Sequence, residues 1–212
     1  MSQLQFQIVG ARAEPYTASP MLTFRLCIKD SLGEPIESIA LRAQLRIEPG
    51  RRRYDHSEEE RLEELFGTPD RWGDTLRGFL WTQTSLLVPA FAGTCEIDIP
   101  LPCTYDFEVA ASKYFDGLQG GEVPVLMLFS GTIFRRTESG FNVEQIPWDL
   151  EAAYRLPVSV WRDAMNFHFP NAAWLRLQKE TFDELYRFKA KRAMTTWDQA
   201  VTELLSLAGE KL

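Results

Sequence analysis

Apolar and polar residues alternate along four segments in the first half of the chain, at residues 3–9, 22–28, 39–47 and 94–99, and strand signals also occur at residues 79–88. Successive side chains of a strand point to opposite faces, so this alternation predicts strands with one buried face and one wet face. Residues 39–47 show it most clearly, because isoleucine, leucine and alanine alternate there with arginine and glutamine. These segments predict an antiparallel β-sheet or a sandwich-like core.

A long antiparallel hairpin is predicted at residues 123–148. Its first arm, residues 123–134, is nearly continuous in apolar residues but too short to cross a membrane as a helix. Such a run is typical of a strand that is covered on both faces. The chain then turns at Ser139 and Gly140 and returns as a second strand with alternating character.

Two short helical segments are predicted within the strand-rich half. Residues 58–66 form one, since Ser57 and Glu60 have the spacing of a capping box and Gly67 is a suitable C-terminal cap. Residues 107–118 are predicted to be the end of a strand followed by a short helix.

Helical patterns dominate after the hairpin. One helix is predicted to begin near Pro157 and another to span residues 180–192. A last helix is predicted to begin at Thr195 or Thr196, where Thr196 and Gln199 have capping-box spacing. Residues 149–156 are expected to be irregular.

The predicted fold class is therefore α+β, with an antiparallel sheet or sandwich-like core followed by C-terminal helices. We expect residues 1–148 to form the β-rich core and residues 149–212 to form a helical segment that packs on it.

The charge of the chain limits its partners. Its 212 residues carry a net charge of −7, and the acidic excess lies in residues 1–148, with 21 acidic and 14 basic residues. Residues 149–212 hold nine of each sign. This balance disfavours nucleic acid and anionic membranes as partners of the whole molecule.

The three cysteines, Cys27, Cys95 and Cys103, are odd in number and widely spaced, so they do not predict a disulfide framework. The first residues lack the basic start and apolar core of a signal peptide, and no apolar run reaches the length of a membrane span. We therefore expect a cytoplasmic protein without membrane insertion.

Arginines supply the main candidate for a binding surface. Adjacent strands would place same-face arginines side by side, and guanidinium groups bind phosphate or carboxylate in a bidentate manner. The alternative interpretation is a solvated face whose arginines pair with nearby acidic residues. The candidate residues are Arg25 together with Arg42, Arg46, Arg51, Arg52 and Arg53.

No catalytic or metal-binding motif emerges from the spacing of reactive residues. The two histidines, His56 and His168, lie far apart in the chain, and Cys95 and Cys103 lack the close pairing of a zinc site. A serine or cysteine triad has few ways to form with two histidines. No catalytic residue, metal or cofactor is predicted.

Tryptophans are concentrated in and next to the helical part. Large aromatic residues dominate both cores and protein interfaces, so they either fill the contact between helices and sheet or bind a partner. The candidates for a protein interface are Trp148, Trp161, Trp174 and Trp197.

The strings FEVAASKYFDGLQGGEVPVLMLFSGTIF, IPWDLEAAYRLPVSVW and FPNAAWLRL resemble a bacterial family known only as a domain of unknown function. The similarity covers nearly the whole chain and includes ALRAQLRIEPGRRRY and ELFGTPDRWGDTLRGFLWT. The family has no assigned activity or catalytic residues, so the resemblance transfers none to this chain. It implies a genomic context, since members are often encoded near nickel-iron hydrogenase genes and their maturation factors.

Three hypotheses follow. The leading one is a non-enzymatic accessory protein that binds another protein, with a nickel-iron hydrogenase subunit or maturation factor as the partner that the resemblance implies. The second is a binding protein or enzyme for a small anionic ligand, which would use the arginine-bearing sheet face. The third is a homo-oligomer in which a sheet edge or the last helix pairs with its own copy.

Overall fold

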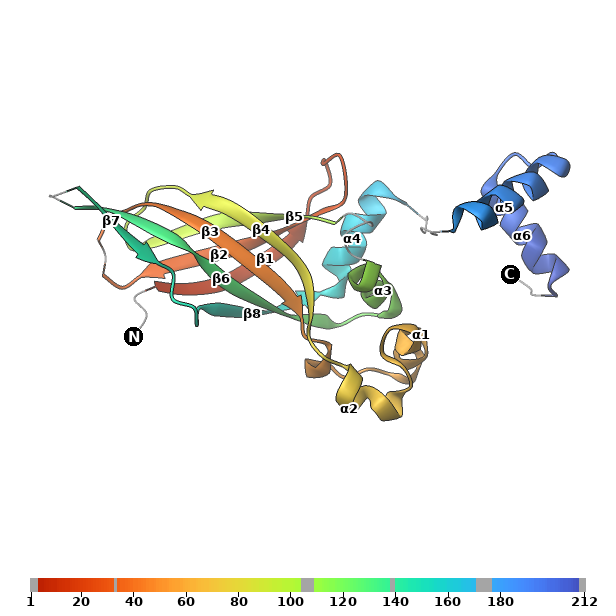
Figure 1. Ribbon diagram of the computed structural model, residues 1–212, viewed down its shortest axis with the longest axis horizontal. Helices are drawn as coiled ribbons and strands as arrows, with labels where there is room; N and C mark the ends of the chain where they lie inside the picture. Colours follow the sequence, from red (N-terminus) through yellow and green to blue (C-terminus); the bar gives the residue numbers. More distant parts are fainter. Residues whose placement is uncertain (1–3, 33, 104–108, 138–139, 171–176, 210–212) are drawn as a thin grey trace. The chain divides into compact units, whose positions relative to one another are not determined.

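The computed structural model describes residues 4–32, 34–103, 109–137, 140–170 and 177–209. The chain divides into two compact units, Met1–Asn171 (unit 1) and Ala172–Leu212 (unit 2) (Figure 1). The boundary expected after Trp148 therefore lies inside unit 1. The expected packing of unit 2 on the β-rich core stays a prediction.

The first sheet, sheet A, is antiparallel and has the strand order β1-β2-β5. Its strands are β1 (Leu4–Ala13), β2 (Met21–Asp30) and β5 (Thr94–Pro102). All three contain a segment whose alternation predicted a strand. β1 carries a register irregularity between Ile8 and Gly10.

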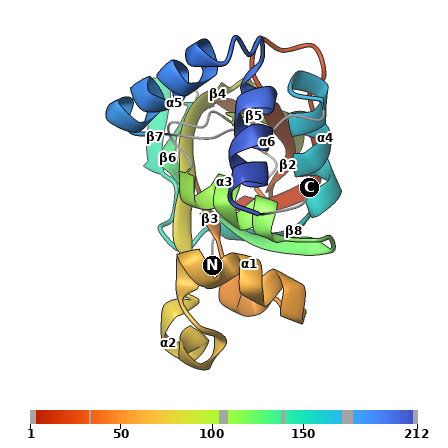
Figure 2. The ribbon, with the colours of Figure 1, turned by 90° about the vertical axis from the view of Figure 1, so that its right-hand side faces the viewer.

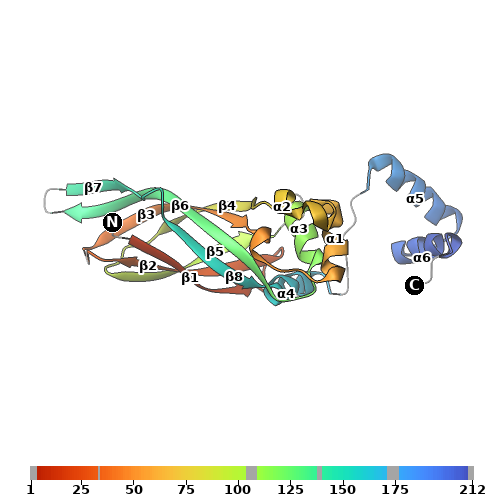
Figure 3. The same cartoon turned by 90° about the horizontal axis from the view of Figure 1, so that it is seen from below.

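The second sheet, sheet B, has five antiparallel strands in the order β4-β3-β6-β7, and β8 also pairs with β6. These strands are β3 (Ile36–Ile47), β4 (Phe79–Val88), β6 (Glu122–Thr137), β7 (Gly140–Gln145) and β8 (Glu151–Pro157). The β6–β7 hairpin confirms the one that was predicted (Figure 3).

The expectation that residues 149–156 are irregular was wrong. Most of that segment is strand β8, which runs antiparallel to β6 with Leu156 opposite Val123. Ala152 and Leu156 are buried in it. The strand is only seven residues long, so its alternation is too brief to separate from a loop by pattern alone.

The two sheets pack face to face as a sandwich, so the α+β class with an antiparallel core is confirmed. Phe6 of sheet A lies against Phe129 of sheet B, with ring centroids 4.6 Å apart. Phe24 of sheet A reaches Tyr154 and Trp81 of sheet B at 6.0 and 6.2 Å. Burial of these inner faces supplies the main hydrophobic stabilisation of unit 1.

Strand β6 is not covered on both faces, contrary to the sequence-based prediction. Val125, Met127 and Phe129 are buried on the inner face, whereas Leu126 and Leu128 are partly exposed on the outer face. The continuous apolar run therefore arises from a buried inner face and a partly exposed outer face that is also apolar.

Helices of unit 1 gather at one end of the sandwich (Figures 1 and 2). They are the α-helices α1 (His56–Phe66), α2 (Trp72–Thr75), α3 (Val109–Gly117) and α4 (Val158–His168), with the 3-10 turns η1 (Pro49–Arg51) and η2 (Pro69–Arg71). α1 and α3 confirm the predicted short helices, while residues 107 and 108 lie outside the described residues. α4 confirms the helix predicted to begin near Pro157.

The N-terminal cap of α1 is Asp55 rather than Ser57. The Asp55 carboxylate accepts a hydrogen bond from the Glu58 backbone N–H at 3.0 Å. Ser57 lies inside the helix and donates its own hydroxyl to Asp55. At the other end Gly67 has φ 74°, which confirms the predicted glycine cap.

Unit 2 contains the two amphipathic helices α5 (Lys179–Lys191) and α6 (Trp197–Leu207). Thr196 and Gln199 form the predicted capping box at the start of α6. Trp197 joins the two helices, since its ring lies 5.2 Å from Phe182 and 6.2 Å from Tyr186.

Candidate functional site

The outer surface of sheet B brings two of the predicted arginines together. Residues directly opposite in an antiparallel ladder share one face. Arg42 is opposite Ser85 of β4 and Ser130 of β6, and Arg46 is opposite Leu80 and Leu126 in the same two strands. We call this surface the arginine face; its residues are Ala40, Arg42, Gln44, Arg46, Leu80, Gln83, Ser85, Leu87, Leu126, Leu128, Ser130 and Thr132.

The arginine face combines exposed aliphatic groups with cationic groups. Leu87 is 70% exposed and Leu80 is 48% exposed. Arg46 donates to the Gly78 carbonyl at 3.0 Å and lies 3.6 Å from the Glu48 carboxylate. The Arg42 residue is exposed, and its side chain has no hydrogen bond or ion pair to another residue in the described parts of the chain. Its guanidinium is therefore available to an external acceptor.

Arg25 does not belong to this surface. Its strand β2 lies in sheet A, whereas Arg42 and Arg46 lie in sheet B. The Arg25 guanidinium pairs with Asp98 and Glu96 of β5, and the hydrogen bond to Asp98 is the main cause of its raised pKa. The expectation that these arginines lie side by side was wrong, because neighbouring strands in sequence need not share a sheet.

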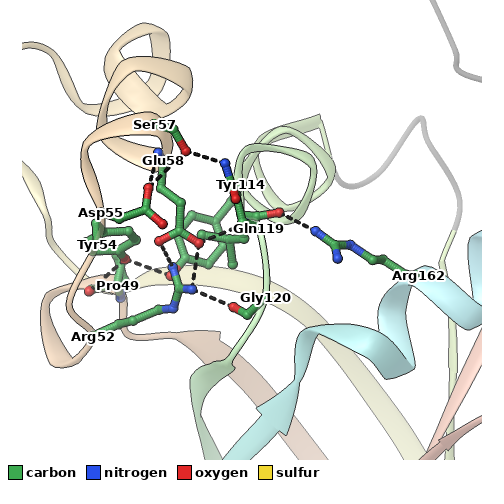
Figure 4. A network of polar contacts seen from close by, with 11 residues as sticks. Pro49, Arg52, Tyr54, Asp55, Ser57, Glu58, Tyr114, Gln119, Gly120 and Arg162 are labelled. Atoms are coloured by element: carbon green, nitrogen blue, oxygen red, sulfur yellow. Dashed lines mark hydrogen bonds and ion pairs between the residues drawn. The ribbon is translucent and has the colours of Figure 1, made fainter.

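The run Arg51 to Arg53 divides into different environments. Arg51 at the end of η1 and Arg53 are exposed, while the Arg52 side chain is only 10% exposed. Arg52 Nη1 donates to Glu58 Oε2 at 2.9 Å, and Nη2 donates to Oε1 at 2.8 Å (Figure 4). Both terminal nitrogens of the Arg52 guanidinium therefore already donate to an internal carboxylate, so Arg52 is not free to bind an external anion.

The Arg52–Glu58 pair ties three segments together (Figure 4). Arg52 also donates to the Gly120 carbonyl at 2.6 Å, and the Gln119 backbone N–H donates to Glu58 at 2.8 Å. Burial acts to raise the pKa of Glu58, but the Arg52 and Gln119 hydrogen bonds outweigh it, so this pKa lies below its usual value. The pair thus fixes the start of α1 against the loop after α3.

Two tyrosines extend this network into the core. The Tyr54 hydroxyl donates to the Pro49 carbonyl at 2.9 Å and lies 2.7 Å from the Tyr114 hydroxyl. Tyr114 is fully buried, and burial raises its pKa far above the usual range. Burial also raises the pKa of Tyr54. Both phenols therefore stay protonated at neutral pH, and the network has the character of a structural joint.

A second buried ion pair links the two sheets at the opposite end. Arg135 of β6 is 2% exposed and donates from Nη1 to Asp30 Oδ2 of β2 at 2.7 Å. The hydrogen bond to Asp30 raises the pKa of Arg135. Sequence analysis missed this pair, since the two residues lie more than one hundred positions apart and no local pattern connects them.

The candidate tryptophans have three different settings. Trp161 is 2% exposed and stacks on Phe115 with centroids 4.5 Å apart, so it is a core residue. Trp148 is 94% exposed, and Trp197 is 39% exposed within unit 2. Trp174 lies outside the described residues. Among the described tryptophans that were proposed for an interface, only Trp148 and Trp197 are therefore accessible to a partner.

The histidines and cysteines do not gather into a metal site in the described parts of the chain. His56 is exposed at the start of α1, whereas His168 on α4 contacts the Ala164 carbonyl through Nδ1 at 3.0 Å and the Thr17 carbonyl through Nε2 at 2.9 Å. Cys27 and Cys103 are buried. Among the described residues, no three His, Cys, Asp or Glu side chains are grouped to hold a metal ion.

The architecture defines an α+β protein with an antiparallel sandwich core and added helices. The chain belongs to a family of unknown function, DUF6084, whose model matches residues 1–212. Comparison with curated proteins gives no match. None of the described helices has the length and apolar character needed to cross a bilayer.

Solved structures show only a distant likeness. A putative late embryogenesis abundant protein, solved in solution, is 10% identical with a TM-score of 0.35, and the match covers 73% of this chain and 70% of that one. A β-glucosidase from Kluyveromyces marxianus is 8% identical with a TM-score of 0.28, covering 73% of this chain and 15% of the enzyme. Neither likeness carries an argument about function.

Proposed function

We propose that this protein is a non-enzymatic accessory protein that binds another protein through the arginine face. The observation that carries the proposal is the composition of this surface: exposed leucines lie beside Arg42, whose guanidinium has no partner in the described chain. Protein interfaces combine aliphatic contacts with arginine, which is enriched there relative to other surface residues. A sheet face that served solubility alone would carry polar groups in place of Leu80 and Leu87.

The chemistry of the surface supports an acidic partner. Arg42 and Arg46 stand on the arginine face of a chain whose overall net charge is −7. A partner that presents carboxylates beside an apolar patch would pair with these guanidinium groups and cover the leucines. Complementary charge of this kind increases the association rate and fixes the register of the two surfaces.

The spacing of the arginines favours a protein over a small anionic ligand. Arg42 and Arg46 are four residues apart on one strand, which separates their Cα atoms by about 13 Å. Arg52 is already bound to Glu58. A small phosphate or carboxylate would therefore meet one free guanidinium, whereas an extended protein surface reaches both.

The resemblance to a family encoded near nickel-iron hydrogenase genes gives the first partners to test, namely a hydrogenase subunit or a maturation factor. The purified protein would be mixed with each candidate, and binding would be measured by isothermal titration calorimetry. Binding to none of them would remove the hydrogenase assignment and leave the arginine face to be tested with partners from the native host.

The general test compares matched charge reversals. The tagged chain is crosslinked in its own host as wild type, as Arg42→Glu with Arg46→Glu, and as the control Arg71→Glu with Arg77→Glu. The control makes the same charge change at exposed arginines outside the arginine face. We expect the first double variant to lose the crosslinked partner and to weaken binding of the purified partner by about 30-fold or more. A partner retained by that variant would refute the proposal.

A further inference from the structure

Strand β4 forms one edge of sheet B and differs from the other strands with an open edge. β4 pairs only with β3 among the described strands. Every second residue of an antiparallel strand directs its N–H and C=O away from its partner strand. The outward groups of β4 have no hydrogen bond to another strand in the described chain, and they form a row that accepts a further strand.

The other strands at sheet edges carry features that oppose pairing. β5 has Glu96, Asp98 and two prolines, whereas β7 has Glu144 and is only six residues long. Charges and prolines on edge strands are known devices against edge-to-edge association. β8 and β1 are charged too, through Glu151, Arg155 and Arg12.

β4 lacks these charges and prolines along its whole length, and its register irregularity lies near its first residues. Its sequence FLWTQTSLLV contains no charged residue and no proline over ten positions. The pairing of β4 with β3 has one register irregularity, near Trp81, because Leu45 pairs with Thr82 whereas Arg46 pairs with Leu80. The distortion therefore lies at the start of the strand. From Thr82 to Val88 the ladder is regular, and this seven-residue stretch includes the β-branched residues Thr82, Thr84 and Val88.

We propose that β4 pairs antiparallel with β4 of a second copy, so that two five-stranded sheets join into one continuous sheet across a two-fold axis. A second copy is the occupant that fits, because an uncharged edge of this acidic chain meets its own copy without like-charge repulsion. At β5 the same encounter would bring Glu96 and Asp98, which pair with Arg25 of the same sheet, near the same two carboxylates of the second copy. The pairing also covers part of Leu87, which is 70% exposed.

The dimer and the partner proposed for the arginine face share the β4 residues Gln83, Ser85 and Leu87, but the two proposals are tested separately. The dimer forms from the purified chain alone, so its absence would leave the arginine-face proposal standing. The reverse also holds, because loss of a partner after charge reversal at Arg42 and Arg46 is read from the crosslinked complex and not from the mass of the purified wild-type chain.

The experiment measures the mass of the full chain by native mass spectrometry and sedimentation across a dilution series. The wild type is expected to show twice the monomer mass of 24.4 kDa, with concentration-dependent dissociation. Hydrogen exchange should show protection of amides in residues 82–88 that is lost on dilution. A monomer at every concentration would overturn the proposal.

Matched variants locate the contact. Gln83→Lys with Ser85→Lys adds two charges to exposed positions of β4, and Val143→Lys with Gln145→Lys adds the same charges to exposed positions of β7. The β4 variant is expected to be monomeric and the β7 variant dimeric. Mixing the β4 lysine variant with Gln83→Glu, Ser85→Glu chains should restore a dimer that contains one chain of each kind. A β4 lysine variant that stays dimeric, or a β7 variant that dissociates equally, would overturn the proposal.

Discussion

The Arg52–Glu58 ion pair gives the sharpest test of how unit 1 is held together. Glu58→Gln keeps a hydrogen-bonding group of nearly the same size but leaves the Arg52 charge without its counter-ion. The two side chains are 10% and 4% exposed, so water cannot replace the lost carboxylate well. Breaking a buried pair from one side costs about 3–5 kcal/mol of unfolding free energy.

This loss corresponds to a large fall in thermal stability. For a chain of this length 1 kcal/mol shifts the midpoint by about 2–4 °C, so the predicted fall is roughly 6–20 °C. Glu64→Gln is the control, because Glu64 lies on the same helix and pairs with Lys113 of α3, but on the surface. That pair is exposed, so the control should lose less than about 1 kcal/mol. Equal losses from the two substitutions would refute the reasoning.

The pH dependence of the wild type provides a second readout of the same pair. The pKa of Glu58 is lower in the folded state than in the unfolded chain, so the unfolded state binds the proton more readily. The stabilisation is therefore present above the unfolded pKa and is lost as the pH falls through the folded pKa. Urea titrations at decreasing pH should show the difference between wild type and Glu58→Gln becoming smaller in acid.

Three further substitutions test other parts of the fold. Asp30→Asn leaves Arg135 buried with no carboxylate partner at Asp30, and urea unfolding should show a loss of about 3–5 kcal/mol. Gly131→Ala should cost roughly 2–4 kcal/mol in the same assay, because Gly131 has φ 143° and a Cβ would lie 2.0 Å from the Ala40 carbonyl oxygen. Thr196→Ala removes the side-chain cap of α6 and should lower the free energy of unfolding of unit 2 by about 1 kcal/mol, which circular dichroism should show as melting at a lower temperature.

Local patterns predicted the individual elements well because each pattern reflects a short-range cause. The alternation of residues 39–47 became β3, with Leu41 and Leu45 buried and Arg42 exposed. The capping residues of α6 and the glycine after α1 were also found where hydrogen bonding requires them. These features depend on residues within a few positions of each other, so the sequence contains the necessary information.

Long-range arrangement was not predictable in the same way. Nothing local indicates that β2 and β3 belong to different sheets, and this assignment separates Arg25 from Arg42. The burial of Arg52 depends on Gln119 and Gly120, which approach it only in the folded chain. One local signal was available: Asp55 and Glu58 have the same capping spacing as Ser57 and Glu60.

The distribution of tryptophans makes the protein its own optical reporter. Trp81 and Trp161 lie 6.2 Å apart in the core of unit 1, so they should couple in the ultraviolet circular dichroism spectrum and lose this signal when that core opens. Trp148 is almost fully exposed and should respond to a soluble quencher in the native state. Trp197 reports on unit 2, where it contacts both helices. Single replacements of these residues by phenylalanine would therefore let the unfolding of the two units be followed separately in one intact chain.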